Sequence, residues 1–441
     1  MHHTQPTLRR ELGRWDLTAI GINQVIGGAI FLMPAQVAAQ VGNWAVLALV
    51  AIGVASMCVA LCFAEVGSRF EGTGGPYLYT RAAFGRFVAF EVGWMQWFTR
   101  ATSQASVANG LALALGFYWP VVTSGFGRAA VISGITLALL WINVRGIKQS
   151  AWVVNALTIG KLVPLFIFIV GGLFFLRPER LASFPPVTLE QAATAALLLI
   201  FTFGGFDVIG VPAGEATRPR QHLPFAFITT ITLVTAVYVL AQLVAMTVLP
   251  DVAVSRTPLT DAAALMFGAA GALMISIGSV LSMTGNNAGS VLTGSRMLFA
   301  LGENRELPRW FARIHPTYRT PHHAVLFTSL VALVLMLSGS FVFLAAVSAI
   351  ARLITYTGAC AAMLALRQPR FAARVKPATF IVPGGPLVPA IAIGSSMLIL
   401  VLANRQQLFA GIAGLVAGGL LFILNDRLRG RDSHEPLPVT P

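Results

Sequence analysis

Long apolar runs recur along the whole chain and constrain its fold more than any other feature of the sequence. Each run contains about 20 residues with few or no charges, the length that an α-helix needs to cross the hydrocarbon core of a bilayer. Of the 441 residues, 56% are hydrophobic and only 10% are charged, and a soluble domain cannot bury so many apolar side chains. The sequence therefore predicts an all-α integral membrane protein.

Twelve of these runs can be delimited, so we expect twelve transmembrane helices. The polar connections between them are short, and even the longest, residues 302–321 and 367–377, cannot form a separate soluble domain. One membrane domain therefore accounts for the chain. The twelve expected spans are residues 15–40, 43–67, 84–117, 126–143, 150–176, 190–214, 223–249, 262–300, 323–338, 341–366, 384–403 and 407–425.

Positive charges lie mostly on one side of this predicted topology. Most of the 30 lysine and arginine residues fall in the termini and the even-numbered connections, whereas five fall on the other side: Arg128, Arg177, Arg180, Arg256 and Arg405. The positive-inside rule then places both tails, residues 1–14 and 426–441, in the cytoplasm. The same asymmetry favours an even number of spans and explains the formal net charge of +14 without a nucleic-acid partner.

The first and sixth spans share an unusual motif, a glycine pair followed by a proline. The two motifs are Gly27-Gly28 with Pro34 and Gly204-Gly205 with Pro212. Glycine and proline weaken helical hydrogen bonding, and broken backbone survives at membrane depth only where protein or a polar cavity satisfies it. One such motif could simply allow helices to pack closely. Two interrupted spans at matching places indicate the binding site of a transporter.

Alignment of the first span with the sixth divides the helices into two successive halves. Spans one to five (residues 15–176) form the first half, and spans six to ten (residues 190–366) form the second. The last two spans (residues 384–425) are appended. Because five is odd, the second half enters the membrane from the opposite side. We therefore expect inverted repeats, which supply two conformations by exchanging roles.

The backbone groups freed at the two breaks indicate the kind of ligand. A helix that restarts at Gly27–Ala29 presents free N–H groups, and the positive end of its dipole, to a carboxylate. The half-helices that end there and near Phe203–Gly205 present free carbonyls, which suit an ammonium group or a small cation. Together the breaks predict a receptor for a zwitterion.

Lys161 is the most informative charged residue within the spans. If the fifth span begins near residue 150, a rise of 1.5 Å per residue places Lys161 roughly 16 Å along it, about halfway across a ~30 Å hydrocarbon core. A lysine at that depth could bind and release a proton as the cavity opens and closes. Alternatively, it could be a fixed charge that donates to carbonyls at a helix break and replaces a sodium ion.

Asp207, in the sixth span, is open to several interpretations. It could be a proton-linked carboxylate, the partner of a cationic substrate, or the partner of Arg352 in the tenth span. Asp207 could thus favour a basic substrate or be neutralised by Arg352, and the sequence does not decide between them. Arg100 and Glu91, in the third span, are expected to be paired internally or to reach an interface.

The spans offer few groups for other kinds of chemistry. They contain no nucleophile–base pair and no set of metal ligands, so we expect neither an enzyme nor a metal or cofactor site. The three cysteines, Cys58, Cys62 and Cys360, are expected to be small packing residues.

With these motifs assembled, the chain resembles the amino acid-polyamine-organocation transporter family from about Leu12 to Leu366, with a weaker tail. The break in the first span is similar to the family's glycine-rich break. A highly specific match is the end of the second span, Ala64–Phe70, followed by Gly74-Gly75-Pro76-Tyr77. The family pattern also matches Phe203–Asp207 and, after the eighth span, Ser295-Arg296 with Leu307-Pro308.

The resemblance implies a LeuT-like fold of five plus five inverted spans and secondary active transport of amino acids. It also implies roles for seven residues near the breaks. In the first span, the residues that would hold the α-carboxylate and ammonium group of the substrate are Val25, Gly27, Gly28 and Ala29. In the sixth span, the residues that would complete the site are Phe201, Phe203 and Gly204, with Phe201 as the gate.

Two positions bear further on what the resemblance implies. Lys161 matches a branch of the family in which a lysine of the fifth span occupies the place of a sodium ion, which implies proton coupling. The family commonly has glycine where this chain has Ala29, whose methyl group would narrow the approach to the carboxylate.

The sequence therefore favours a plasma-membrane amino acid transporter that works by alternating access as a proton symporter. Its expected partners are an amino acid, the proton and the lipid bilayer, and no oligomeric state is indicated. One alternative is an exchanger or uniporter in which Lys161 is a fixed charge. Another is a transporter-like sensor that binds an amino acid without turnover.

Overall fold

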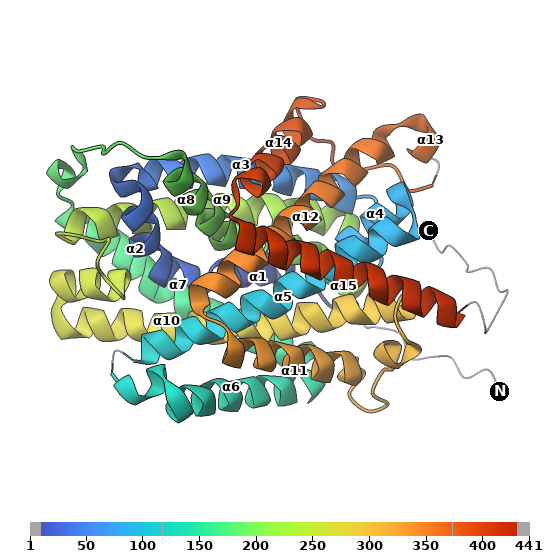
Figure 1. Ribbon diagram of the computed structural model, residues 1–441, viewed down its shortest axis with the longest axis horizontal. Helices are drawn as coiled ribbons and strands as arrows, with labels where there is room; N and C mark the ends of the chain where they lie inside the picture. The colour runs from blue at the N-terminus through green and yellow to red at the C-terminus, as the bar shows by residue number, and fades with distance from the viewer. Residues whose placement is uncertain (1–9, 117, 146, 373, 430–441) are drawn as a thin grey trace.

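The fold consists of helices that mostly run along the long direction of the molecule (Figure 1). The computed structural model describes residues 10–116, 118–145, 147–372 and 374–429. Within these ranges it contains no strand, only an isolated backbone bridge between Leu12 and Ala216. The prediction of an all-α chain is confirmed for these residues. The outer parts of the predicted tails, residues 1–9 and 430–441, lie outside the described ranges.

The helices follow the order of the apolar runs, and each of the twelve expected stretches is largely helical. The first stretch is α1 and α2 with a break between them, and the sixth is α8 followed by the 3₁₀ helix η5. The α-helices are α1 (Arg14–Val25), α2 (Ala29–Val41), α3 (Ala45–Gly67), α4 (Pro76–Phe84), α5 (Arg86–Leu115), α6 (Gly125–Arg145), α7 (Ile147–Gly172), α8 (Leu189–Phe203), α9 (Pro219–Val248), α10 (Pro258–Glu303), α11 (His322–Ser338), α12 (Phe341–Arg367), α13 (Pro369–Ala372), α14 (Leu387–Leu402) and α15 (Arg405–Arg429). The 3₁₀ helices are η1 (Gly42–Trp44), η2 (Pro120–Thr123), η3 (Leu173–Phe175), η4 (Pro178–Leu181), η5 (Phe206–Glu215) and η6 (Arg309–Ala312).

Eight helical segments in the described residues are long and apolar enough to cross a membrane. They are Ala29–Gly67, which joins α2 and α3, and Gly125–Arg145, Asn155–Phe175, Leu189–Glu215, Pro219–Val248, Pro258–Glu303, Phe341–Arg367 and Arg405–Leu428. The apolar helices α11 and α14 are shorter, and the 30 residues of α5 include Glu91, Gln96 and Arg100. Segments of this length and composition indicate a multi-pass membrane protein.

The longest helix, α10, has 46 residues and is kinked at Gly268, whose φ is +65°. At 1.5 Å per residue, a straight helix of that length would extend roughly 69 Å, more than twice the ~30 Å thickness of the hydrocarbon core. The kink divides α10 into a short first segment and a long second one. The long segment carries Ser282, Met283 and Asn286 to the centre of the bundle.

Helices from the two predicted halves pack against each other in matching pairs. α1 contacts η5, α3 contacts α9, α5 contacts α10, and α6 contacts α11. The appended helices lie outside these pairs, with α14 against α12 and α3, and α15 against α5 and α12. Since α1 and η5 both also contact α9 and α10, the two broken segments are enclosed by the other helices.

Gly53→Leu should destabilise the fold because α3 meets α9 at this glycine. A Cβ at Gly53 would lie 2.8 Å from Thr235 Cγ2 and 3.3 Å from Phe203 Cζ, and overpacking of this kind costs about 1–3 kcal/mol. Gly134→Leu is the matched control, since a Cβ there meets nothing within 4 Å. The measurement is the thermal unfolding midpoint in detergent. Equal midpoints for the two variants would contradict the packing of α3 on α9.

Candidate functional site

The first break separates α1 from α2 at Ile26, Gly27 and Gly28. The Gly27 N–H donates to Val25 O at 2.8 Å, which closes a tight turn in place of a helical turn. Side chains of α10 cover the break closely. A Cβ added at Gly27 would lie 2.7 Å from Asn286 Nδ2, and a Cβ added at Gly28 would lie 3.2 Å from Met283 Cγ. The break therefore starts a new helix whose first N–H groups have no acceptor within that helix.

The second break lies between α8 and η5, at Gly204 and Gly205. Gly205 has a φ of +137°, a conformation that is open to glycine and strained for other residues. A Cβ at Gly205 would lie 2.5 Å from both the carbonyl carbon and the carbonyl oxygen of Gln24. The two breaks, far apart in the sequence, therefore meet backbone to backbone. After the break, the chain continues as a 3₁₀ helix instead of the second α-helical half that the sequence predicts.

The Tyr238 hydroxyl, from α9, links the two breaks. It donates to Val25 O at 2.6 Å, and it also lies 3.1 Å from Thr202 O. These are carbonyls near the ends of α1 and α8, where no helical N–H follows to satisfy them. Tyr238 is only 2% exposed, so a single buried hydroxyl serves both helix ends.

Two polar side chains of α10 complete the capping of the first break. Asn286 Nδ2 donates to Gln24 O at 2.8 Å. The Ser282 hydroxyl lies 3.1 Å from Ile26 O and 3.0 Å from Gly27 O. The free carbonyls that the sequence assigns to an ammonium group or a cation thus have protein donors in this conformation.

Lys161, from α7, also lies at the first break and is fully buried. Its Nζ donates to Asn23 O at 3.0 Å, to Asn23 Oδ1 at 2.7 Å, and to Ile26 O. An ammonium group has three protons, so each has an acceptor here. Lys161 therefore occupies the position of a small cation at the end of α1, where the partial negative charge of the helix lies.

Asp207, at the start of η5, is shared by two buried arginines. Its Oδ1 lies 3.5 Å from Arg100 Nη2 and 3.6 Å from Arg352 Nε. Gln96 Nε2 lies 3.4 Å from Asp207 Oδ2, and Arg100 Nη1 donates to Gln24 Oε1 at 3.3 Å. Pairing of Asp207 with Arg352 was one of the interpretations that the sequence allowed, and the structure contains this pair. Arg100 also pairs with the same carboxylate.

The remaining predicted residues lie around the same two breaks. Phe201 is 5% exposed and meets Phe341, at the start of α12, edge to face with ring centroids 6.2 Å apart. Phe203 packs similarly on Tyr238, at 5.4 Å. Ala29 begins α2 and is 3% exposed. The structure therefore brings together the residues predicted from both spans.

Contacts at both ends of the bundle close the space around the breaks. At one end, the N–H groups of Glu11 and Leu12 donate to Glu215 O, both at 2.9 Å. At the other, Arg180 donates to the carbonyls of Thr247 and Val248. A cavity beside the first break, lined by residues that include Ala29, Thr202 and Tyr238, measures about 10 Å³, which is too small for an amino acid. This cavity therefore has no room for a substrate in the present conformation.

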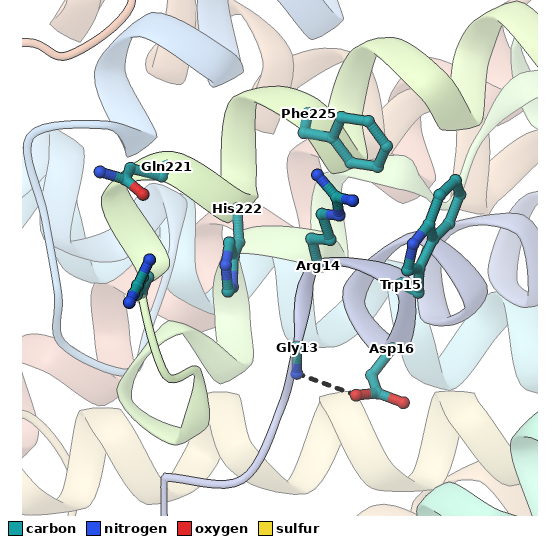
Figure 2. A pocket seen from close by; sticks show the side chains of 8 residues that line it. Gly13, Arg14, Trp15, Asp16, Gln221, His222 and Phe225 are labelled. Carbon is teal, nitrogen blue, oxygen red and sulfur yellow. Dashed lines mark hydrogen bonds between the residues drawn. The ribbon is translucent and has the colours of Figure 1, made fainter.

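A larger cavity of about 630 Å³ opens at the surface, away from the breaks (Figure 2). Within it, the Gly13 N–H donates to Asp16 Oδ2 at 2.8 Å, and Trp15 meets Phe225 edge to face. None of the predicted site residues lines it. Its lining comes from the starts of α1 and α9: Gly13, Arg14, Trp15, Asp16, Arg218, Gln221, His222 and Phe225. In the described ranges, no three His, Cys, Asp or Glu side chains are grouped to hold a metal ion.

Sequence reasoning did not identify Tyr238, Ser282 and Asn23 as capping residues. Each is a polar side chain within an apolar run, which is the one signal that could have singled them out. Glu215, at the end of η5, lies 3.7 Å from Arg296 of α10.

Comparisons with known proteins give one consistent result. The family profile described as "Amino acid permease" matches residues 12–416. The serine/threonine exchanger SteT of Bacillus subtilis is 29% identical over 94% of this chain and 97% of its own length. In the same organism, the branched-chain amino acid permease BcaP is 27% identical and the methylthioribose transporter 26% identical, each over 96% of this chain and 94% of its own length.

Tyr238→Phe should lower stability because it removes the hydroxyl that donates to Val25 O and lies 3.1 Å from Thr202 O, and of these two carbonyls only Val25 O keeps the Gly27 N–H as a donor. A buried polar group left without a partner costs about 1–3 kcal/mol. The thermal unfolding midpoint in detergent is the measurement, and Tyr318→Phe, at an exposed tyrosine, is the control. A midpoint equal to that of the control would mean that Tyr238 does not hold the breaks together.

Gly205→Ala should be more damaging than an ordinary glycine substitution. The φ of +137° is strained for alanine, at about 1–3 kcal/mol, and the new Cβ would collide with the backbone of Gln24. Gly394→Ala is the control, because nothing lies within 4 Å of a Cβ there and alanine suits a helix interior. The measurement is the yield of folded protein and its thermal midpoint. Similar values for both variants would show that the two breaks do not touch.

Proposed function

The chain belongs to the amino acid permease family, and on that premise we propose that it carries amino acids across the plasma membrane by alternating access. The family match confirms the resemblance predicted from the motifs. The observation that carries the proposal is the backbone contact between the two glycine breaks. It places the end of α1 against the second break in the buried centre of the molecule, and α2 packs on α8 beside it.

The proposed substrate site uses the groups freed at the breaks. The first N–H groups of α2, at Gly28 and Ala29, bind the α-carboxylate. The carbonyl oxygens of Val25 and Thr202 accept from the ammonium group once Tyr238 releases them. Phe201 acts as the gate and moves off Phe341 to admit the substrate. The Ala29 methyl group narrows the approach to the carboxylate.

The proposed topology is a LeuT-like fold of twelve spans with both termini in the cytoplasm. Four of the five equivalent pairs of spans in a five-plus-five repeat are in contact: α1 with η5, α3 with α9, α5 with α10, and α6 with α11. Contacts between equivalent spans are expected when two inverted halves lie around a shared axis. The site between the two breaks would then open to either side as one half moves relative to the other.

Lys161 is the proposed coupling residue. It lies at the first break, where gain or loss of its proton would change the hydrogen bonds that hold the end of α1. A proton that binds more tightly in one conformation than in the other shifts the equilibrium between them. Proton symport follows if this change accompanies substrate binding.

An exchanger is the second candidate, and a specific observation favours it. Each of the three protons of Lys161 has an oxygen acceptor in the structure, the arrangement of a fixed charge. A fixed charge at this point removes proton binding from the cycle, and exchange results if the protein changes conformation only with substrate bound. SteT, a relative over almost the whole chain, is named as an exchanger.

Lys161→Met should abolish accumulation driven by a proton gradient, because methionine cannot carry a proton. The measurement is uptake of each of the twenty labelled amino acids into proteoliposomes, with an inward proton gradient and without sodium. Lys376→Met removes a partly exposed lysine that pairs with Glu71 and serves as the control.

The outcomes separate the candidates. Uptake that ignores the gradient, but requires an amino acid inside the liposome, supports the exchanger. Gradient-driven accumulation by the Lys161→Met variant would refute proton coupling through this residue. Failure of every amino acid to be taken up or exchanged would refute the transport proposal itself.

A further inference from the structure

The centre of the molecule holds more positive than negative charge. Arg100, Arg352 and Lys161 are each at most 2% exposed, and Asp207 is the carboxylate that pairs with two of them. Among the described residues, the nearby pair of Glu215 and Arg296 is neutral by itself. Charge buried at membrane depth is costly unless it is paired. With Lys161 protonated, the three positive charges and one negative charge of the cluster leave it with a net charge of +2.

Arg352 is the member of the cluster with unused donors. A guanidinium has five N–H groups, yet Arg352 makes a single long hydrogen bond, from Nη1 to Phe201 O at 3.5 Å. Its Nε lies 3.6 Å from Asp207 Oδ1, beyond hydrogen-bond distance. In the described part of the chain, Nε and Nη2 are buried without any hydrogen-bond partner.

Asp207 is already engaged elsewhere. Arg100 Nη2 and Gln96 Nε2 both lie within 3.5 Å of its carboxylate. Gln104 lies one helical turn beyond Arg100 on the same face of α5, and its amide oxygen and nitrogen also have no partner among the described residues. Arg352 on α12 thus keeps unused donors beside a carboxylate that α5 already engages.

The Arg352 side chain lies directly against the second break. A Cβ at Gly204 would be 1.6 Å from Arg352 Nη1 and 2.0 Å from Cζ, so the guanidinium covers this glycine at contact distance. Nη1 also reaches the carbonyl of Phe201, the proposed gate. The guanidinium of Arg352 therefore lies beside the end of α8, at the second break.

We propose that Arg352 binds a second carboxylate of the substrate, so that the transporter selects dicarboxylic amino acids; this inference rests on the proposed function. A carboxylate fits the fork of a guanidinium through two parallel N–H···O bonds. The α-carboxylate and ammonium group would lie at the first break, and the side-chain carboxylate would meet Nε and Nη2 of Arg352.

The charge balance favours this class over the others. An amino acid with two carboxylates carries a net charge of −1 and lowers the net charge of the cluster from +2 to +1. A neutral amino acid leaves the charge of the cluster unchanged, and a basic one increases it. The sequence also allowed Asp207 to bind the basic side chain of a substrate. The structure disfavours this interpretation because two arginines already share the Asp207 carboxylate.

The test compares substrates that differ in one group. Uptake of labelled L-glutamate and L-glutamine, and of L-aspartate and L-asparagine, is measured in proteoliposomes containing the full chain. The wild type should prefer the acid to its amide by about tenfold or more. Arg352→Gln should bring that ratio close to one, and Arg352→Lys, which keeps the charge without the fork, should give an intermediate ratio. Arg405→Gln removes an exposed arginine and should keep the wild-type ratio.

Each result has a defined meaning. Equal uptake of acid and amide by the wild type would overturn the inference, whether or not the Arg352 variants fold. A strong acid preference that persists in Arg352→Gln would overturn the role of Arg352. Uptake of neutral amino acids alone would refute this inference and leave the proposed function standing. If no amino acid is taken up or exchanged, both fail.

Discussion

The structure depends on one constraint: backbone polar groups released by a broken helix must find partners within the protein, because lipid offers none. Two helices break at the same place, and three neighbouring helices supply the donors. Tyr238 comes from α9, Ser282 and Asn286 come from α10, and Lys161 comes from α7. The need to cap two helix ends thus explains why these four polar side chains lie inside a very apolar chain.

The same capping gives the proposed transport cycle a physical basis. A substrate with an ammonium group and a carboxylate offers the hydrogen bonds that the caps now make, so binding exchanges partners and leaves few groups unsatisfied. Such an exchange costs little and can favour one conformation over another. Arg352 fits the same logic, since its unused donors at the second break are available to a ligand.

The sequence predicted features that arise within one segment. Glycine pairs reveal the breaks, and the position of Lys161 within an apolar run reveals its depth, because both follow from local composition. The sequence could not predict which charged side chains on different helices pair with each other. Arg100 meets Asp207, and Glu215 meets Arg296, because the tertiary packing determines which side chains face each other. Tyr238 could not be recognised from the sequence for the same reason, and neither could the 3₁₀ geometry of η5, which packs on α1.

The most direct test is a cryo-electron microscopy map of the protein at saturating concentrations of the amino acid that it binds. The account predicts ligand density between the first residues of α2 and the end of α8, with the Tyr238 hydroxyl moved from at least one of its two carbonyls. Density elsewhere, with Tyr238 still bonded to Val25 O, would contradict the claim that the two breaks form the substrate site.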